Sequence, residues 1–251
     1  MKKIGMIGGL AWPSTLEYYR LICQRVSDIH QRRGDVPPYG VPEMVIESVN
    51  IAHTRALRGV QGDEASWHHF DQVFRETLLR LKAAGADFGC IASNTPHMRL
   101  AAITDRLDFK VVSIIDAMAS VAKQLAAKRV LILGTSVTMT SPVYAEVLNN
   151  AGIPTCPPLP MEVIAEIQHL IDTDFYTGRA VAARARFVAI CRKYMQTPQT
   201  VIALACTELP LAFPDHLDEA VFVFEDLTFI NTTVAHVEAI VSQVMTSESE
   251  I

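Results

Sequence analysis

The chain repeats a short pattern about half its length apart, and this repeat constrains the fold more than any other feature. Residues 3–9 (KIGMIGG) form an apolar run that ends in glycine, and residues 129–135 (RVLILGT) contain a similar run. Each run indicates a buried strand that turns into a helix. A hydroxyl residue and a tyrosine follow at matching offsets, which are Ser14 and Tyr18 in the first copy and Thr140 and Tyr144 in the second.

A second pair of similar segments follows in the same order. Phe88–Ala92 leads into Ser93-Asn94-Thr95, and Val201–Ala205 leads into Cys206-Thr207-Glu208. One likeness between two βα units would mean little, but two in the same order indicate duplication. We therefore predict an α/β protein with two pseudo-symmetric, Rossmann-like lobes, each a parallel four-stranded sheet flanked by helices. Ligands of such folds bind at the carboxyl ends of strands, often between lobes.

Short β-branched runs alternate with longer amphipathic stretches along the whole chain, as in βα units. The predicted strands are 3–7, 43–49, 87–92, 110–113, 129–133, 200–205 and 220–224, and the predicted helices are 66–84, 117–127, 142–150 and 178–195. Residues 28–42, rich in charge, Gly and Pro, are predicted to form a long surface loop. The first lobe would comprise residues 1–115 plus 214–251, and the second lobe residues 116–213.

Composition disfavours several classes of function. Half of the 251 residues are apolar, a fifth are charged and the net charge is −5, as in an ordinary soluble protein. No basic stripe supports nucleic-acid binding, and no run reaches the roughly 18 apolar residues of a membrane span. The five cysteines include no CxxC pair, which indicates free thiols and a cytoplasmic protein. His68-His69 has no HExxH context, so no metal site is predicted.

Two positions are candidates for a functional role because of where they lie in the predicted fold. Gly8-Gly9 followed by Ser14 is either a tight βα turn or a polar helix N-terminus that holds a carboxylate. The segment matches neither the dinucleotide-binding nor the P-loop glycine pattern, which disfavours nucleotide binding. Cys206 lies at a predicted strand end and helix N-terminus, a position that lowers the pKa of a thiol below about 8.5. The other four cysteines are interpreted as inert buried side chains.

With these motifs in order, the chain resembles the aspartate/glutamate racemase family over nearly its whole length. The resemblance rests on segments at family-like spacing, which are 4–15 (IGMIGGLAWPST), 18–20 (YYR), 93–97 (SNTPH), 114–117 (IIDA), 133–139 (LGTSVTM) with Tyr144, and 205–208 (ACTE). It implies an amino-acid substrate, neither pyridoxal phosphate nor metal, and a homodimer.

In that family a cysteine in each lobe flanks the substrate α-carbon. One thiolate removes the α-proton, and the opposite thiol protonates the other face. Hydrogen-bond donors then stabilise the developing enediolate. The substrate-binding residues that the resemblance implies are Ser14, Asn94, Thr95, Thr135 and Thr207. His97, Asp116 and Glu208 are interpreted as residues that fix the geometry of the loops.

This sequence departs from the family pattern at the first cysteine, where it has Ser93. A serine hydroxyl is a far weaker acid than a thiol and a poor base without a partner. Some family members carry threonine here and remain racemases, so the resemblance implies that Cys206 and Ser93 are the catalytic residues. Cys206 would take a proton from one enantiomer more readily than Ser93 takes one from the other. Cys90 is no substitute for Ser93, because a strand of period two would point it to the opposite face.

The sequence leaves the substrate open. Glu166 aligns with a lysine that pairs with the substrate carboxylate in many family members. A substrate-binding role for Glu166 would disfavour dicarboxylic amino acids; otherwise Glu166 is a solvated helix residue or the alignment is off by a turn. Arg55 and Arg58 either supply a cation or are surface residues. Asp226 matches the C-terminal family motif, but Asn231 stands where a histidine is usual.

Two other functions are compatible with these residues. A lyase that decarboxylates malonate-type acids would use Cys206 alone and protonate the enediolate on one face. An inactive, ligand-binding paralogue would also tolerate Ser93, although the retained Cys206-Thr207-Glu208 argues against it.

Overall fold

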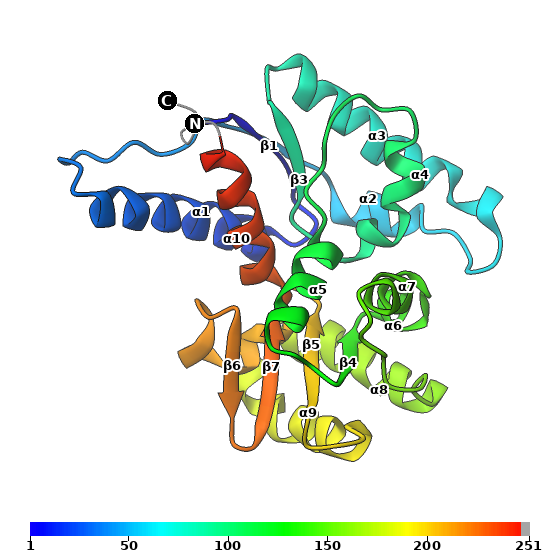
Figure 1. Ribbon diagram of the computed structural model, residues 1–251. Helices are drawn as coiled ribbons and strands as arrows, with labels where there is room; N and C mark the ends of the chain where they lie inside the picture. The colour runs from blue at the N-terminus through cyan, green and yellow to red at the C-terminus, as the bar shows by residue number, and fades with distance from the viewer. Residues whose placement is uncertain (247–251) are drawn as a thin grey trace. The chain divides into compact units, whose positions relative to one another are not determined.

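The computed structural model describes residues 1–246, and the chain forms two compact units. The first unit combines Met1–Ser113 with the chain from His236 onward, and the second is Ile114–Ala235. Figure 1 shows the course of the chain through both units. Among residues 1–246, no helix has the length and apolar character required to cross a membrane.

The first unit is built on a parallel sheet of three strands in the order β2-β1-β3. Its strands are β1 (Ile4–Gly8), β2 (Met44–Ser48) and β3 (Phe88–Ile91). Its helices are α1 (Trp12–Arg33), α2 (Ile51–Ala56), α3 (His68–Ala83) and α4 (Leu100–Thr104), with the 3-10 turns η1 (Glu64–Trp67) and η2 (Thr95–Arg99). The helix α10 (Thr232–Met245) joins this unit from His236 onward. The central strand β1 is buried at every residue, and α3 packs against all three strands (Figure 1).

The second unit is built on four strands in the order β4-β5-β7-β6. Its strands are β4 (Arg129–Gly134), β5 (Thr200–Ala205), β6 (Val221–Phe224) and β7 (Leu227–Asn231). Its helical segments are α5 (Ile114–Gln124), α6 (Ser136–Thr140), α7 (Val143–Asn150), α8 (Met161–Leu170), the π-helical η3 (Ile171–Phe175), α9 (Ala180–Tyr194), and the 3-10 turns η4 (Leu209–Ala212) and η5 (Pro214–His216). The α/β class and the parallel strands flanked by helices are confirmed.

The prediction of four strands in the first sheet is wrong. Residues 110–113 make a single bridge, between Gly89 and Val111. Two backbone hydrogen bonds accompany it, from Gly89 N–H to Lys110 at 2.8 Å and from Val112 N–H to Gly89 at 2.9 Å. The segment cannot extend the sheet further because α5 begins at Ile114.

The second sheet has four strands, but one of them is antiparallel. β6 and β7 form a hairpin that turns at Glu225 and Asp226. Glu225 has φ 55°, the left-handed conformation that a tight hairpin turn needs. Arg192 binds the carboxylates of both turn residues, which places Asp226 at the surface of the hairpin.

The hairpin also changes the division of the chain. β7 pairs in parallel with β5, so residues 214–235 belong to the second unit and not to the first lobe as predicted. The sequence pattern did not reveal β7, and without that strand the segment had no visible partner. The other predicted boundary, after residue 115, is close to the observed one after Ser113.

Helix α1 occupies the first part of the segment, residues 28–42, that the sequence predicted to be a surface loop. It runs through Arg33 into the predicted surface loop, and Gly34 ends it with a left-handed φ of 80°. The N–H groups of the cap bond back to the last turn of the helix, which satisfies its terminal carbonyls. Pro13 lies in the first turn, where its missing N–H costs nothing. The buried face of the helix consists of Ser14, Tyr18, Leu21, Ile22 and Val26.

Candidate active site

In the first unit, the polar segments leave the sheet at the carboxyl ends of β1 and β3. These strands pair in parallel, with Ile7 opposite Ile91, so their exits lie at one edge. The Ser14 hydroxyl donates to the Ala11 carbonyl at 2.8 Å and lies 3.3 Å from the Ala92 carbonyl. Ser14 therefore ties the start of α1 to the segment that leaves β3.

The turn after β1 uses its own donors internally. The Gly9 N–H donates to the Thr15 hydroxyl at 2.9 Å. Gly9 has φ 78°, and a Cβ there would lie 2.2 Å from the Val49 carbonyl oxygen, so this position requires glycine. The hydroxyl of Ser14 and the N–H of Gly9 are thus both engaged within the tight βα turn.

The segment Ser93-Asn94-Thr95 forms a turn that His97 stabilises. Asn94 and Thr95 are buried, and Ser93 is half-buried. The backbone N–H of His97 donates to Asn94 at 3.0 Å, and its ring Nδ1 lies 2.8 Å from the Ser93 carbonyl. A carbonyl only accepts, so Nδ1 carries the ring proton. His97 therefore closes a ring of bonds around the predicted catalytic segment.

Burial keeps His97 neutral. The ring is 2% exposed, and desolvation lowers the pKa of His97 to about 4 despite its bond to Ser93. Because Nδ1 donates, Nε2 is an acceptor, and it has no hydrogen-bond partner among residues 1–246.

His236 is a buried residue that the sequence analysis missed. Its Nε2 lies 2.9 Å from the Val112 carbonyl and its Nδ1 lies 2.8 Å from the Tyr18 hydroxyl. The Val112 carbonyl requires a proton on Nε2, so Tyr18 donates to Nδ1. Burial and the nearby ring of His97 lower the pKa of His236 to about 3. The only sequence signal was the repeat position of Tyr18, which did not point to a histidine partner.

In the second unit, Cys206 follows the last residue of the inner strand β5. Its thiol donates to Glu208 Oε2, with the sulfur 2.9 Å from the oxygen. The Thr207 hydroxyl donates to Glu208 Oε1 at 3.0 Å. Cys206 and Glu208 are each 4% exposed. A carboxylate is thus buried beside a thiol and a hydroxyl at the carboxyl end of the sheet.

The packing of the second unit fixes the position of this segment. Leu209 and Phe213, which follow it, are buried, and η4 packs against α9. The Phe213 ring centroid lies 4.9 Å from that of Phe229 and 5.1 Å from that of Phe222. The backbone after Cys206 is therefore held against the core of the sheet.

Two further groups lie near the carboxyl end of β5. Tyr144 is fully buried, and burial together with the neighbouring Cys206 raises the pKa of its phenol. The Thr232 hydroxyl donates to the Leu204 carbonyl at 2.7 Å. Of the groups described around Cys206, Glu208 is the acidic side chain that accepts a hydrogen bond from the thiol.

Thr135 lies at the neighbouring strand exit. β4 pairs with β5, with Gly134 opposite Ala205. Thr135 caps α6, and its hydroxyl lies 3.4 Å from the Thr138 backbone nitrogen and 3.1 Å from the Thr138 hydroxyl. The structure therefore brings Thr135 to the same edge of the sheet as Cys206.

Glu166 is engaged in an ion pair within the second unit. Its Oε1 lies 2.6 Å from Arg186 Nε in a partly exposed ion pair between α8 and α9. The α8 residue that reaches the β4 exit is Gln168, whose Oε1 accepts the Ser136 N–H at 2.8 Å. The sequence analysis missed Gln168 because no motif marked the helix face it occupies.

The remaining predicted residues have local roles. Asp116 is exposed in the first turn of α5, where a carboxylate favours the helix dipole. Asn231 caps α10, since its Oδ1 accepts the Thr233 N–H at 3.1 Å and its Nδ2 donates to Leu217 at 3.2 Å.

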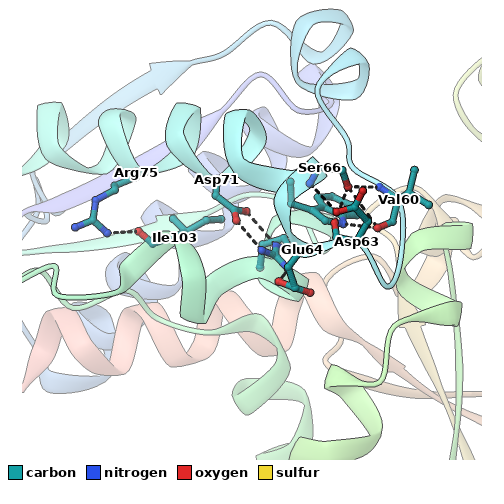
Figure 2. A network of polar contacts seen from close by, with 9 residues as sticks. Val60, Asp63, Glu64, Ser66, Asp71, Arg75 and Ile103 are labelled. Atoms are coloured by element: carbon teal, nitrogen blue, oxygen red, sulfur yellow. Dashed lines mark hydrogen bonds and ion pairs between the residues drawn. The ribbon is translucent and has the colours of Figure 1, made fainter.

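A polar network anchors the segment that follows Ser93. Arg99 binds Asp71 through two nitrogens, at 2.7 and 3.1 Å, and Glu64 at 2.6 Å. Its guanidinium also lies 5.5 Å from the centre of the Trp67 ring. Figure 2 shows Asp71 and Glu64 with their polar contacts, together with Arg75, which donates to the Ile103 carbonyl at 3.2 Å. The turn η2 is thereby fixed to α3 and η1.

Within residues 1–246, no three His, Cys, Asp or Glu side chains are grouped in a way that would hold a metal ion. The described cysteines are all free thiols.

Comparisons with known proteins identify relatives of the whole chain. A family model described as Asp/Glu/hydantoin racemase matches residues 7–240. The structure of an aspartate racemase homologue from Pyrococcus horikoshii OT3 is 27% identical, covers 100% of both chains and has a TM-score of 0.72. Aspartate racemase from Picrophilus torridus is 19% identical over 99% of this chain and 95% of its own, with a TM-score of 0.68, and shares the fold.

Proposed function

Because the chain belongs to the Asp/Glu/hydantoin racemase family, we propose that it is a cofactor-independent amino-acid racemase with Cys206 as its main proton-transfer group. The observation that carries this proposal is the buried thiol that follows β5 and donates to Glu208 at 2.9 Å. A thiol is suited to this role because it exchanges a proton readily near neutral pH.

The proposed reaction inverts the α-carbon. Cys206 transfers a proton on one face, and the Ser93 side transfers a proton on the other. The electron pair left by the α-proton moves into the substrate carboxylate as an enediolate. N–H and O–H donors at fixed positions stabilise this charge. The donors we propose are Asn94, Thr95 and the backbone N–H of Thr207, since the Thr207 hydroxyl donates to Glu208.

We propose an acidic amino acid as the substrate. The sequence-based argument against dicarboxylic substrates rested on Glu166, whose carboxylate is paired with Arg186. Arg55 and Arg58, half-buried in the segment after β2, supply cations in the first unit. The similar protein from Pyrococcus horikoshii is described as an aspartate racemase homologue, which makes aspartate the first substrate to test.

The test is proton NMR in D₂O with the L and D forms of aspartate, glutamate, and a neutral and a basic amino acid. Wild type is expected to lose the α-proton signal of its substrate. Cys206→Ala is expected to slow this exchange by about 10²- to 10⁴-fold, because the variant lacks the proton-transfer group. Cys191→Ala is the matched control, since Cys191 is a buried thiol of the same unit and burial raises its pKa.

The outcomes separate the candidate functions. Exchange that persists in Cys206→Ala would contradict the role of the thiol. If no amino acid exchanges, the racemase proposal fails, and malonate-type acids are then assayed for decarboxylation. Ser93, which leaves Cys206 as the only thiol of the two motifs, is the observation that favours this lyase as the second candidate.

A further inference from the structure

Glu208 has both carboxylate oxygens engaged by the two residues before it. Oε2 accepts from the Cys206 thiol at 2.9 Å, and Oε1 accepts from the Thr207 hydroxyl at 3.0 Å. The Thr207 bond orients the carboxylate, so that its second oxygen meets the sulfur. The Cys206 proton can therefore reach the Glu208 carboxylate across a single hydrogen bond, and we call this arrangement the proton path.

This geometry opposes the simplest route to a reactive thiolate. If the thiol lost its proton to water, two negative charges would lie about one hydrogen bond apart in a buried site. Like charges at this separation strongly disfavour ionisation of both groups. Burial adds to the effect, because it weakens the solvation of each charge. The resting pair therefore holds one proton and one negative charge.

Resting on the proposed function, we propose that Glu208 is the residue that accepts the proton of Cys206 and so generates the thiolate. The Sγ–H bond breaks, an Oε2–H bond forms, and the electron pair stays on sulfur. The pair keeps a charge of −1 before and after this transfer, so no second charge is buried. Thr207 positions the carboxylate for it.

The half-reaction on the Cys206 face balances without another reagent. The thiolate takes the α-proton, which restores Sγ–H and leaves the electron pair on the substrate as the enediolate. Exchange of the thiol with D₂O and return of a deuteron to carbon restore the thiolate and the carboxylic acid. Glu208 acts on the substrate only through the sulfur of Cys206, so it is a positioning residue in the proposed reaction.

The experiment compares wild type with Glu208→Gln in two measurements. The thiolate absorbance of Cys206 is titrated, taking the difference from Cys206→Ser to remove the other thiols. We expect the titration midpoint to move to lower pH by about one unit or more in Glu208→Gln, because the neighbouring negative charge is gone. We expect α-proton exchange to fall by about 10²-fold, because the proton acceptor is gone.

Opposite changes in the two measurements are the signature of this role. A residue that only held the fold would leave the titration midpoint unchanged, and one that only suppressed the thiolate would speed exchange when removed. A midpoint that stays or rises, or exchange that is unaffected, would overturn the proposal. Glu208→Asp, which keeps a carboxyl group one methylene further back, is expected to retain more exchange than Glu208→Gln and serves if the glutamine variant does not fold.

The titration needs no substrate, so it separates this proposal from the function it rests on. If Cys206→Ala leaves exchange intact, the racemase role of the thiol fails, whatever the titration shows. If Cys206→Ala abolishes exchange but Glu208→Gln changes neither the exchange rate nor the midpoint, the proton path alone fails. Glu162→Gln, which removes an exposed carboxylate of the same unit, is the matched control and is expected to leave both the midpoint and the exchange rate unchanged.

Discussion

In the proposed reaction, Ser93 sets how fast a proton is transferred on one face of the α-carbon relative to the Cys206 face. Its carbonyl is bound by His97, and its position after β3 is fixed by the backbone bond from Ser93 N–H to Ile91 at 2.8 Å. The backbone is thus set while the side chain supplies a hydroxyl, a far weaker acid than a thiol.

Ser93→Cys is therefore expected to raise the rate of full inversion. A thiol transfers protons near neutral pH, so we expect a gain of about tenfold or more in racemisation, measured by polarimetry or chiral chromatography. Ser93→Ala, which keeps the size and removes the hydroxyl, is the control and is expected to lose inversion while it keeps exchange of one enantiomer. A Ser93→Cys variant with unchanged inversion would show that this position does not transfer protons.

At the level of single residues, the sequence predicted positions along the chain better than contacts between side chains. Cys206 was marked by its place after an apolar strand, and the structure places it there. The ion pair of Glu166 with Arg186 could not be predicted from the sequence, because the two residues are twenty positions apart and lie on different helices. The bond between Cys206 and Glu208 was also out of reach, because it depends on the turn that the chain takes after β5.

At the scale of elements, the side chain of His236 connects α10 to α1 and to the segment before α5. His236 is fully buried, receives the Tyr18 hydroxyl and donates to Val112. Its pKa is lowered to about 3, and that of His97 to about 4. An unfolded histidine titrates near 6.5, so between these values the unfolded chain binds protons that the folded chain does not.

Stability is consequently expected to fall as the pH drops from about 6.5 to 4. The slope is about 1.4 kcal/mol per pH unit for each of the two histidines while the folded form stays neutral. Urea unfolding at a series of pH values measures it. His236→Gln is expected to lose part of the slope, and His69→Gln, at an exposed position, is the control. Equal slopes in wild type and His236→Gln would contradict the assignment.

The elements predicted best were those with a clear period and a nearby partner. β5 was predicted at its observed bounds, and the helices α3 and α9 nearly so. The pattern did not distinguish β6 as antiparallel, because pairing direction depends on the hairpin at Glu225 and not on the strand itself. Residues 110–113 have the composition of a strand but make one bridge, because α5 begins directly afterward.

At the scale of the whole molecule, we propose that the chain forms a homodimer through α1. Trp12, Leu16 and Tyr19 lie one helical turn apart and are 72%, 60% and 48% exposed. Glu17 and Arg20, paired at 2.6 Å, flank this apolar face. A two-fold interface through this face would bury the three apolar side chains of one copy against those of the other.

Sedimentation equilibrium is expected to give twice the mass of one chain for wild type. The double variant Trp12→Ser with Leu16→Ser is expected to raise the dissociation constant by about 100-fold or more, since buried aromatic anchors dominate interfaces. Val223→Ser, which replaces an exposed apolar residue of the second unit, is the control. A monomeric wild type, or a double variant that associates as well as wild type, would contradict the proposal.

The chain leaves the first unit after Ser113 and returns to it at His236, which sets an order of assembly during synthesis. Val237, Ile240 and Val244 complete the first unit, and Lys2 N–H reaches the Val244 carbonyl at 3.2 Å. A ribosome delivers Ile114–Ala235 whole before it delivers these residues. The second unit can therefore fold while the first still exposes the apolar surface that α10 will cover. Until those residues are made, the uncovered apolar surface of the first unit is exposed to aggregation and to chaperones.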